Sequence, residues 1–186
     1  MPTAALLLAL LGLLLTPGPT NTLMLLAGSD RGFRATLRLI PVELAAYLLT
    51  VTPLLLLAGA AAPHLAAMRP AIALVAGVWV LLLALTLWRG PAEGHGVTVV
   101  TPRHLFVTTL LNPKALIFGL VLLPGAPPVT GLTVFALLVV GTALLWAGLG
   151  AVLPRTRAAS PIAFRRAAAC WLALVSFGIL ANGFSA

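Results

Sequence analysis

Long runs of apolar residues alternate with short polar segments along the whole chain. No charged side chain occurs before residue 30, and none occurs between residues 115 and 154, where a Pro- and Gly-rich segment at 124–128 divides a stretch too long for one helix. About 20 predominantly apolar residues suffice to cross a bilayer. The pattern predicts an all-α integral membrane protein, a single membrane domain over 1–186, with six transmembrane helices at about 4–28, 39–62, 70–88, 105–124, 129–153 and 167–185.

Composition supports a membrane protein over a soluble one. Hydrophobic residues make up 61% of the 186 positions and charged residues 8%, whereas a soluble domain is roughly 45–50% apolar and about 25% charged. Disordered chains are poor in apolar residues and rich in charge, so disorder is excluded as well. The lipid bilayer is therefore the expected surrounding of most of the chain.

The net charge of +8 comes from basic residues that stand singly or in pairs between apolar runs. They form no continuous basic stripe, so we expect no nucleic-acid partner. Cytoplasmic loops of membrane proteins carry an excess of Lys and Arg. Nearly all the arginines lie in the predicted loops after the first, third and fifth helices, and Arg69 is the exception. The arginines in these three loops are Arg31, Arg34, Arg38, Arg89, Arg103, Arg155, Arg157, Arg165 and Arg166. This asymmetry predicts cytoplasmic odd-numbered loops, with both termini outside.

The first predicted helix contains an interruption at residues 16–22, with the sequence TPGPTNT. Pro17 and Pro19 flank Gly18, and each proline removes a backbone donor and disfavours helical geometry in the preceding residue. Backbone groups freed at membrane depth must be satisfied by protein, water or ligand. The segment, with Thr20 and Asn21, is therefore a candidate binding site, although a simple proline kink would give the same pattern.

The fourth predicted helix carries Asn112, Pro113 and Lys114, the only lysine of the chain. Lys114 follows Arg103 by 11 residues and precedes Pro124 by 10, so each membrane surface lies roughly 15 Å away. A charged side chain at that depth is costly and commonly marks a substrate or ion pathway. The alternative is that the lysine side chain extends to the membrane surface.

After the segments at 16–22 and 112–114, Glu43 is the third place where a polar or charged side chain interrupts an apolar run, and Tyr47 follows it by one helical turn. Its position five residues after Arg38 predicts a depth of about 7–8 Å. Either the carboxylate takes part in transport, or it forms a structural ion pair with a loop arginine. Asn21 and Lys114 are both expected roughly 13–17 Å from the cytoplasmic surface, so the three groups are predicted to line one cavity.

The two interruptions occupy corresponding places in the chain. Pro19 and Pro113 each lie in the first helix of a set of three, and two consecutive sets of three have opposite orientations in the membrane. Interrupted helices at matching positions of inverted halves are the best indication of a transporter substrate site that a sequence gives. The prediction is thus two inverted three-helix halves with helices one and four broken.

These motifs resemble the LysE-type family of amino-acid exporters, typified by the lysine exporter and the homoserine/threonine resistance proteins. The number and order of the six predicted helices agree with this family along the whole chain. The residues that carry the resemblance are 16–23 (TPGPTNTL), 32–34 (GFR), 74–89 and 111–116 (LNPKAL). It implies a bacterial inner-membrane exporter of amino acids or similar small metabolites, driven by the proton gradient. The chain departs from the family in having Thr20 before Asn21, and Glu43 where an aspartate in a glycine-rich context is usual.

The predicted function is proton-coupled export of a small zwitterionic substrate, with no cofactor and no catalytic residue. The candidate binding residues are Pro17, Gly18, Pro19, Thr20, Asn21, Glu43, Tyr47, Asn112, Pro113 and Lys114. A cation or metal exporter is an alternative, but His64, His95 and His104 are predicted on different sides of the membrane, so we expect no metal site. A non-transporting membrane subunit is the other alternative. Gly141, Gly148 and Gly150 are compatible with close helix approach in a homodimer and equally with internal packing.

Overall fold

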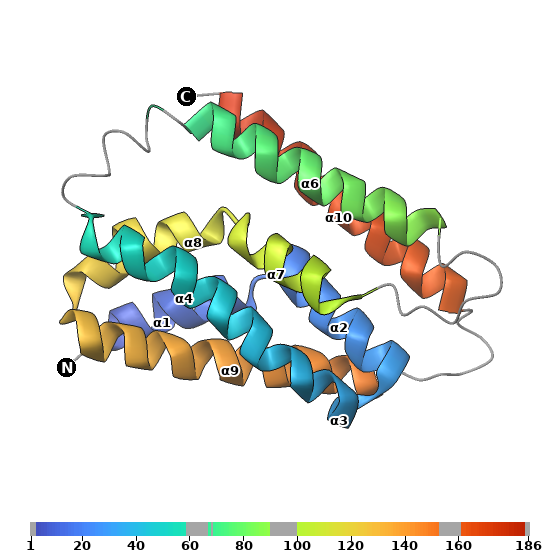
Figure 1. Ribbon diagram of the computed structural model, residues 1–186, viewed down its shortest axis with the longest axis horizontal. Helices are drawn as coiled ribbons and strands as arrows, with labels where there is room; N and C mark the ends of the chain where they lie inside the picture. Colours follow the sequence, from blue (N-terminus) through green and yellow to red (C-terminus); the bar gives the residue numbers. More distant parts are fainter. Residues whose placement is uncertain (1–2, 59–66, 68, 90–99, 153–160, 185–186) are drawn as a thin grey trace.

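The computed structural model describes residues 3–58, 67, 69–89, 100–152 and 161–184, and every element in these ranges is helical. Successive helical runs pass back and forth along the long axis of the molecule (Figure 1). The elements are α1 (Ala4–Leu15), α2 (Pro19–Arg31), α3 (Phe33–Thr36), η1 (Leu37–Leu39), α4 (Ile40–Leu56), α6 (Arg69–Arg89), α7 (Pro102–Leu110), α8 (Lys114–Ile117), the π-helical turn η2 (Phe118–Leu122), η3 (Leu123–Gly125), α9 (Pro128–Val152) and α10 (Pro161–Phe184).

Several helices have the length and composition of membrane spans. Two described stretches qualify alone, Phe33–Leu56 and Pro128–Val152. Two more qualify if each of two bent helix pairs counts as one span, namely Ala4–Leu15 with Pro19–Arg31, and Pro102–Leu110 with Lys114–Leu122. The chain is therefore an all-helical protein with two to four membrane-spanning candidates among its described residues.

The predicted loop at residues 30–38 is wrong, because this segment is helical apart from Gly32. Asp30 and Arg31 end α2, and Gly32 turns the chain at a φ of 80°. That left-handed conformation is accessible to glycine at little cost. The Thr36 hydroxyl donates to the Gly32 carbonyl over 2.9 Å, so α3 starts at once and continues through η1 into α4. Arginines at helix ends had been mistaken for loop residues.

The last helix also begins earlier than predicted. α10 starts at Pro161, so Arg165 and Arg166 are helical and not loop residues. Proline is well suited to the first helical position because its missing N–H has no partner to lose there. The Arg166 guanidinium lies 5.1 Å from the centre of the Trp88 ring, and this cation–π contact joins the start of α10 to the end of α6.

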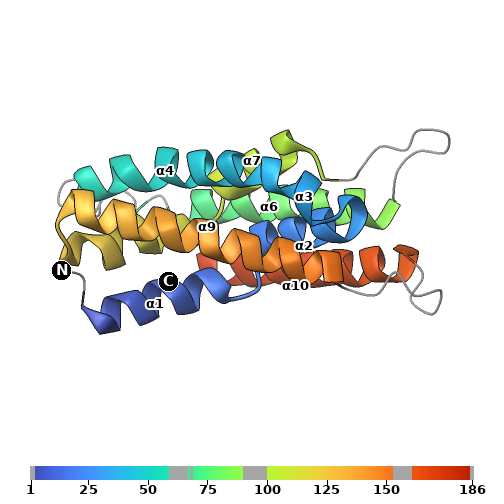
Figure 2. The ribbon, with the colours of Figure 1, turned by 90° about the horizontal axis from the view of Figure 1, so that it is seen from below.

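Two helix pairs pack closely. α2 lies along α9, and α6 lies along α10, in both views (Figures 1 and 2). In the first pair, a side chain at Gly28 would meet the Ala147 carbonyl, and one at Gly150 would meet the Leu25 carbonyl. Each glycine therefore lets the facing backbone approach, which is how small residues bring membrane helices together.

The buried apolar side chains form two separate clusters. One joins α2 with α6, α7, α10 and the later part of α9, and includes Met24, Leu87 and Leu172. The other joins α1 with α4, η2 and the earlier part of α9, and includes Leu14 and Phe118. The breaks between α1 and α2 and between α7 and α8 lie where one cluster gives way to the other.

Candidate functional site

The first break separates α1 from α2 and bends the chain by 60°. The Thr16 side chain folds back and donates to the Gly12 carbonyl over 2.7 Å. Gly18 precedes α2 in an extended conformation, and Pro19 opens that helix. Because proline has no N–H and the chain changes direction, the last carbonyls of α1 lack their usual intrahelical donors. The predicted interruption of the first helix is confirmed.

Two side chains donate to the carbonyls at the end of α1. The Asn21 amide nitrogen lies 2.7 Å from the Leu14 carbonyl and 3.0 Å from that of Thr16. The Lys114 ammonium lies 3.0 Å from the Leu13 carbonyl and 2.5 Å from that of Thr16. A cation at a helix C-terminus also interacts favourably with the helix dipole. Lys114 therefore stabilises the first break, although it belongs to the second.

The second break separates α7 from α8 and bends the chain by 50°, so the predicted interruption of the fourth helix is also confirmed. Here the backbone N–H groups that follow the bend are hydrogen-bonded by a neighbouring residue. The Asn112 side-chain oxygen accepts a hydrogen bond from the backbone N–H of Lys114 over 3.1 Å, and the Asn112 backbone carbonyl accepts one from the backbone N–H of Ala115 over 3.0 Å. The missing N–H of Pro113 falls in the link before α8, where few intrahelical bonds are lost.

Asn112 also joins the second break to the first break and to α4. Its amide nitrogen donates to the Thr20 hydroxyl over 3.2 Å and to the Tyr47 hydroxyl over 3.1 Å. The Thr109 hydroxyl lies 3.5 Å from that of Thr20. All four side chains are buried. A buried network of this kind is stable only when its members are hydrogen-bonded, so the three elements hold one another in register.

Tyr47 is fixed from the opposite side by aromatic rings. Its ring meets those of Phe118 and Phe135 edge-on, with centroids 6.1 Å and 5.8 Å away. Edge-to-face contacts are a favoured aromatic geometry. The hydroxyl is consequently directed to Asn112 by a rigid apolar wall, and Tyr47 connects the polar contacts at the breaks to the cluster around η2.

Glu43 lies one turn before Tyr47 on α4 and is 2% exposed. Its Oε2 atom has no hydrogen-bond partner within the described ranges, and no ion pair there includes this residue. In particular, Glu43 and Lys114 do not form an ion pair. The structure thus gives no support to the alternative of an ion pair with one of the described arginines. A buried acidic group without a partner is costly and is a common sign of function.

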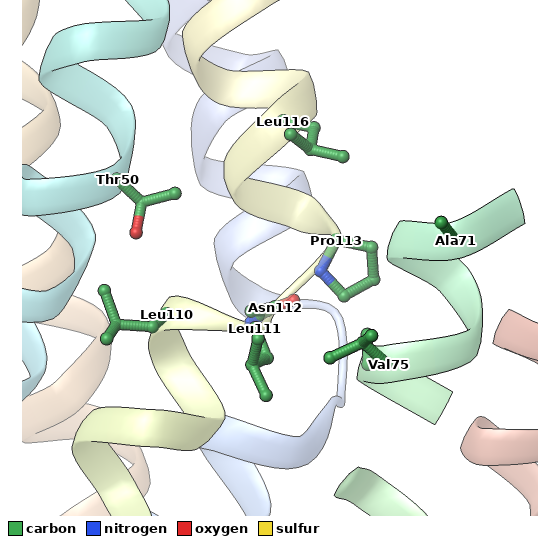
Figure 3. Close-up of a pocket in the computed structure, with 9 residues that line it drawn as sticks. Thr50, Ala71, Val75, Leu110, Leu111, Asn112, Pro113 and Leu116 are labelled. Carbon is green, nitrogen blue, oxygen red and sulfur yellow. The ribbon is translucent and has the colours of Figure 1, made fainter. Parts of the chain in front are cut away.

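A cavity of about 250 Å³ opens beside the second break (Figure 3). Val75 points toward Asn112 and Leu111 across it, and the link between α1 and α2 passes next to Asn112. The cavity therefore adjoins the second break, α4 and one face of α6. The residues that line it are Thr50, Ala71, Val75, Ala76, Leu110, Leu111, Asn112, Pro113 and Leu116.

The predicted residues divide into groups in the structure. Asn21 and Lys114 share the Thr16 carbonyl, and Thr20, Tyr47 and Asn112 share hydrogen bonds. Asn112 and Pro113 line the cavity, whereas the other predicted residues are not among those that line it. Gly18 and Pro19 are buried at the start of α2, and Pro17 is exposed.

Some residues at this site were not predicted from the sequence. Thr109 and Thr50 are threonines in apolar helices, where such residues are common, and no motif distinguishes them. Phe118 and Phe135 looked like ordinary lipid-compatible residues. Among the described residues, no group of three or more His, Cys, Asp or Glu side chains is placed to hold a metal ion.

Comparisons of the chain with family models, with curated proteins and with solved structures find no match. The function must therefore be argued from the residues and their geometry.

Proposed function

We propose that the protein is a secondary transporter that exports amino acids or similar small zwitterionic metabolites across the bacterial inner membrane by proton antiport. The observation that carries the proposal is the meeting of two interrupted helices. Asn112 of the second break hydrogen-bonds to Thr20 of the first, and Lys114 of the second bonds to the α1 end of the first. Transporter substrate sites are commonly built where broken helices meet at the centre of the membrane.

The start of α2 supplies a site for the substrate carboxylate. Helix N-termini bind anions because their first N–H groups are unpaired and the helix dipole is positive there. The nearby Lys114 ammonium would lie 3.2 Å from a side-chain carbon built at Gly18, which places a positive charge beside this N-terminus. This spacing leaves no room for a carboxylate between them, so a substrate carboxylate at this N-terminus would have to draw the Lys114 ammonium away from the Leu13 and Thr16 carbonyls. Substrate binding would then loosen the link between the two breaks.

Glu43 is the proposed proton carrier. It is buried, has an oxygen without a described partner, and precedes Tyr47 by one turn. Acidic side chains within the membrane commonly belong to proton pathways. Tyr47 connects this turn of α4 to Asn112, so a change at Glu43 can reach the hydrogen bonds between the breaks through packed side chains.

The proposed topology has six crossings in two inverted halves, with both termini outside. The back-and-forth course of the helical runs is compatible with it (Figure 1), and the arginine distribution supports the orientation. Tags at each terminus would be accessible to impermeant reagents from the outside of intact cells. A C-terminal tag that reacts only after the cells are opened would refute this orientation.

Metabolite export from cells tests the transporter proposal. Cells that overproduce the protein would be fed mixed dipeptides, and the medium would be analysed by mass spectrometry at matched membrane levels of each variant. The wild type should release particular amino acids at least tenfold faster than Lys114→Ala. Arg34→Ala, which removes a charge from an exposed position on α3, is the matched control and should behave as the wild type. Equal release from wild type and Lys114→Ala would contradict the proposed role of the lysine.

The proton coupling has its own test. Glu43→Gln keeps the size of the side chain and removes its ability to exchange a proton. In proteoliposomes this variant should still exchange labelled substrate across the membrane but should lose accumulation driven by a pH gradient. Unchanged gradient-driven accumulation would exclude Glu43 as the proton carrier.

A further inference from the structure

The cavity beside the second break contains almost entirely aliphatic groups. Its walls come from α6 and from both sides of the break, and the polar side chains among its described residues are Thr50 and Asn112 (Figure 3). None of the described residues that line it is charged. Thr50 already donates to the Ala46 carbonyl of its own helix over 3.1 Å, and the Asn112 amide already bonds to Thr20 and Tyr47. The cavity therefore offers little hydrogen bonding to a polar guest.

The size of the cavity suits a small apolar group. An apolar cavity of about 150 Å³ accommodates a benzene molecule, whereas sites for drug-sized ligands measure about 300–1,000 Å³. The value of about 250 Å³ lies between them. It leaves room for an aliphatic side chain of three or four carbons together with part of the backbone of an amino acid.

The position of the cavity relates it to the proposed carboxylate site. Pro113 lines the cavity and directly precedes Lys114. Asn112, which lines the cavity, bonds to Thr20 at the start of α2, and the link between α1 and α2 passes next to it (Figure 3). A molecule in the cavity would have its apolar part next to Val75, Leu111 and Leu116, and its carboxylate would have to extend past Asn112 and Pro113 to reach the Lys114 ammonium.

We infer that the cavity is the side-chain pocket of the transporter, and that the substrate is a neutral aliphatic amino acid of the size of valine or leucine. This inference rests on the proposed function. A charged side chain is excluded because its burial among aliphatic groups without a partner would be costly. Alanine would bind more weakly than leucine, since each additional methylene in a hydrophobic pocket contributes about tenfold or more to discrimination.

Val75 and Val78 provide a matched pair of variants. Both are partly exposed valines on α6, with 55% and 43% of their surface accessible, but only Val75 lines the cavity. Val75→Phe would fill the pocket from its open side, and Val78→Phe would make the same chemical change elsewhere on the helix. Because neither side chain is buried in the core, both variants are expected to fold.

Binding is measured first, by the thermal stability of the detergent-purified protein with leucine, alanine, lysine or glutamate present. Leucine should stabilise the wild type and Val78→Phe with similar dissociation constants, and alanine should bind at least about tenfold more weakly. Val75→Phe should weaken leucine binding at least tenfold and alanine binding less than threefold. Three results would each contradict the assignment of the cavity as the side-chain pocket. They are equal stabilisation by lysine and leucine, no stabilisation by leucine, and unchanged leucine binding in Val75→Phe.

Transport of the same four amino acids in proteoliposomes separates the two claims. Transport of leucine with the binding pattern above supports both. If Val75→Phe weakens leucine binding but no amino acid is transported, the proposed transport function is refuted and the assignment of the cavity as a leucine-binding pocket stands. Transport of lysine or glutamate at rates equal to leucine would retain the transporter and refute the pocket.

Discussion

The two helix breaks each contain proline and asparagine but are stabilised in different ways. At the second break, Asn112 accepts the N–H groups of Lys114 and Ala115, so the turn is satisfied by its own residues. At the first break, Asn21 donates to the end of α1 from within the interrupted segment, and Lys114 donates to it from the other break. The turn of the second break is therefore hydrogen-bonded by its own residues, whereas the first break also depends on a side chain distant in the sequence.

If the protein is the proposed transporter, we expect the first break to be the one that changes during transport. A local turn keeps its hydrogen bonds when its surroundings move, whereas a turn held by a distant side chain is released when that side chain finds another partner. The competing partner proposed here is the substrate carboxylate. In the proposed mechanism, Lys114 would link substrate binding to the angle between α1 and α2, because it is bonded to α1 and adjoins the start of α2.

Removal of Lys114 should have the largest effect on this arrangement. Lys114→Met removes the charged donor to the Leu13 and Thr16 carbonyls, but Asn21 still donates to that of Thr16. The main loss is therefore the bond to Leu13, and a hydrogen bond to a charged group contributes about 1.5–3 kcal/mol. We expect transport to be lost and the free energy of unfolding in mixed micelles to fall by about 2–3 kcal/mol. Arg34→Met should change neither. A stable Lys114→Met protein would show that the first break does not depend on the second.

Replacement of Asn112 should come next. Asn112→Ala removes the donors to Thr20 and Tyr47 and the acceptor for the Lys114 N–H. Side-chain hydrogen bonds in membrane proteins average about 0.6 kcal/mol and reach about 1.7 kcal/mol, so the expected destabilisation is about 2 kcal/mol. Thr50→Val is the matched control at the same cavity, and should cost less because Thr50 bonds only within its own helix. Equal losses in the two variants would refute the bridging role of Asn112.

Asn21→Ala should have a smaller effect, of about 1 kcal/mol, because Lys114 continues to serve the Thr16 carbonyl. The shared carbonyl makes a sharper test available. Asn21→Ala and Lys114→Met should be non-additive in a double-mutant cycle, since residues that share a partner are coupled. Additive unfolding free energies would mean that the two side chains do not act on the same carbonyl.

Tyr47→Phe should have the smallest effect. It keeps the ring contacts with Phe118 and Phe135 and loses one hydrogen bond, so we expect about 0.5–1 kcal/mol of destabilisation in the same unfolding assay. A loss greater than that of Asn112→Ala would place Tyr47, and not Asn112, at the centre of the network.

The sequence predicts much of the fold because membrane helices follow from apolar length. The helices predicted at 70–88 and 129–153 agree with α6 and α9 to within one residue at each end, although within their described residues only α9 has the length and composition of a membrane span. Prolines, which cannot donate to a helix, predict both interruptions. The errors concern Arg31, Arg34, Arg165 and Arg166. Charge marks the end of an apolar run, but it does not end a helix, and a single glycine such as Gly32 can make the turn.

The contacts at the site were less predictable. The polar residues at the breaks could be identified as unusual, yet their partners belong to other helices. Nothing in the residue pattern shows that Lys114 bonds to the carbonyls of α1, or that Asn112 bonds to Tyr47. Those pairings depend on how α4 and α7 pack, which follows from many weak apolar contacts.

The most direct test uses the fact that Lys114 is the only lysine in the chain. Protein labelled with ¹⁵N at the lysine side chain should give one ammonium NMR signal from the interior of the protein, and leucine would be titrated into the sample in nanodiscs. We expect the signal to shift with leucine concentration in the wild type and in Val78→Phe, and to stay unchanged when lysine or glutamate is added. An ammonium signal that stays constant at leucine concentrations that saturate transport would contradict the claim that the substrate competes for Lys114.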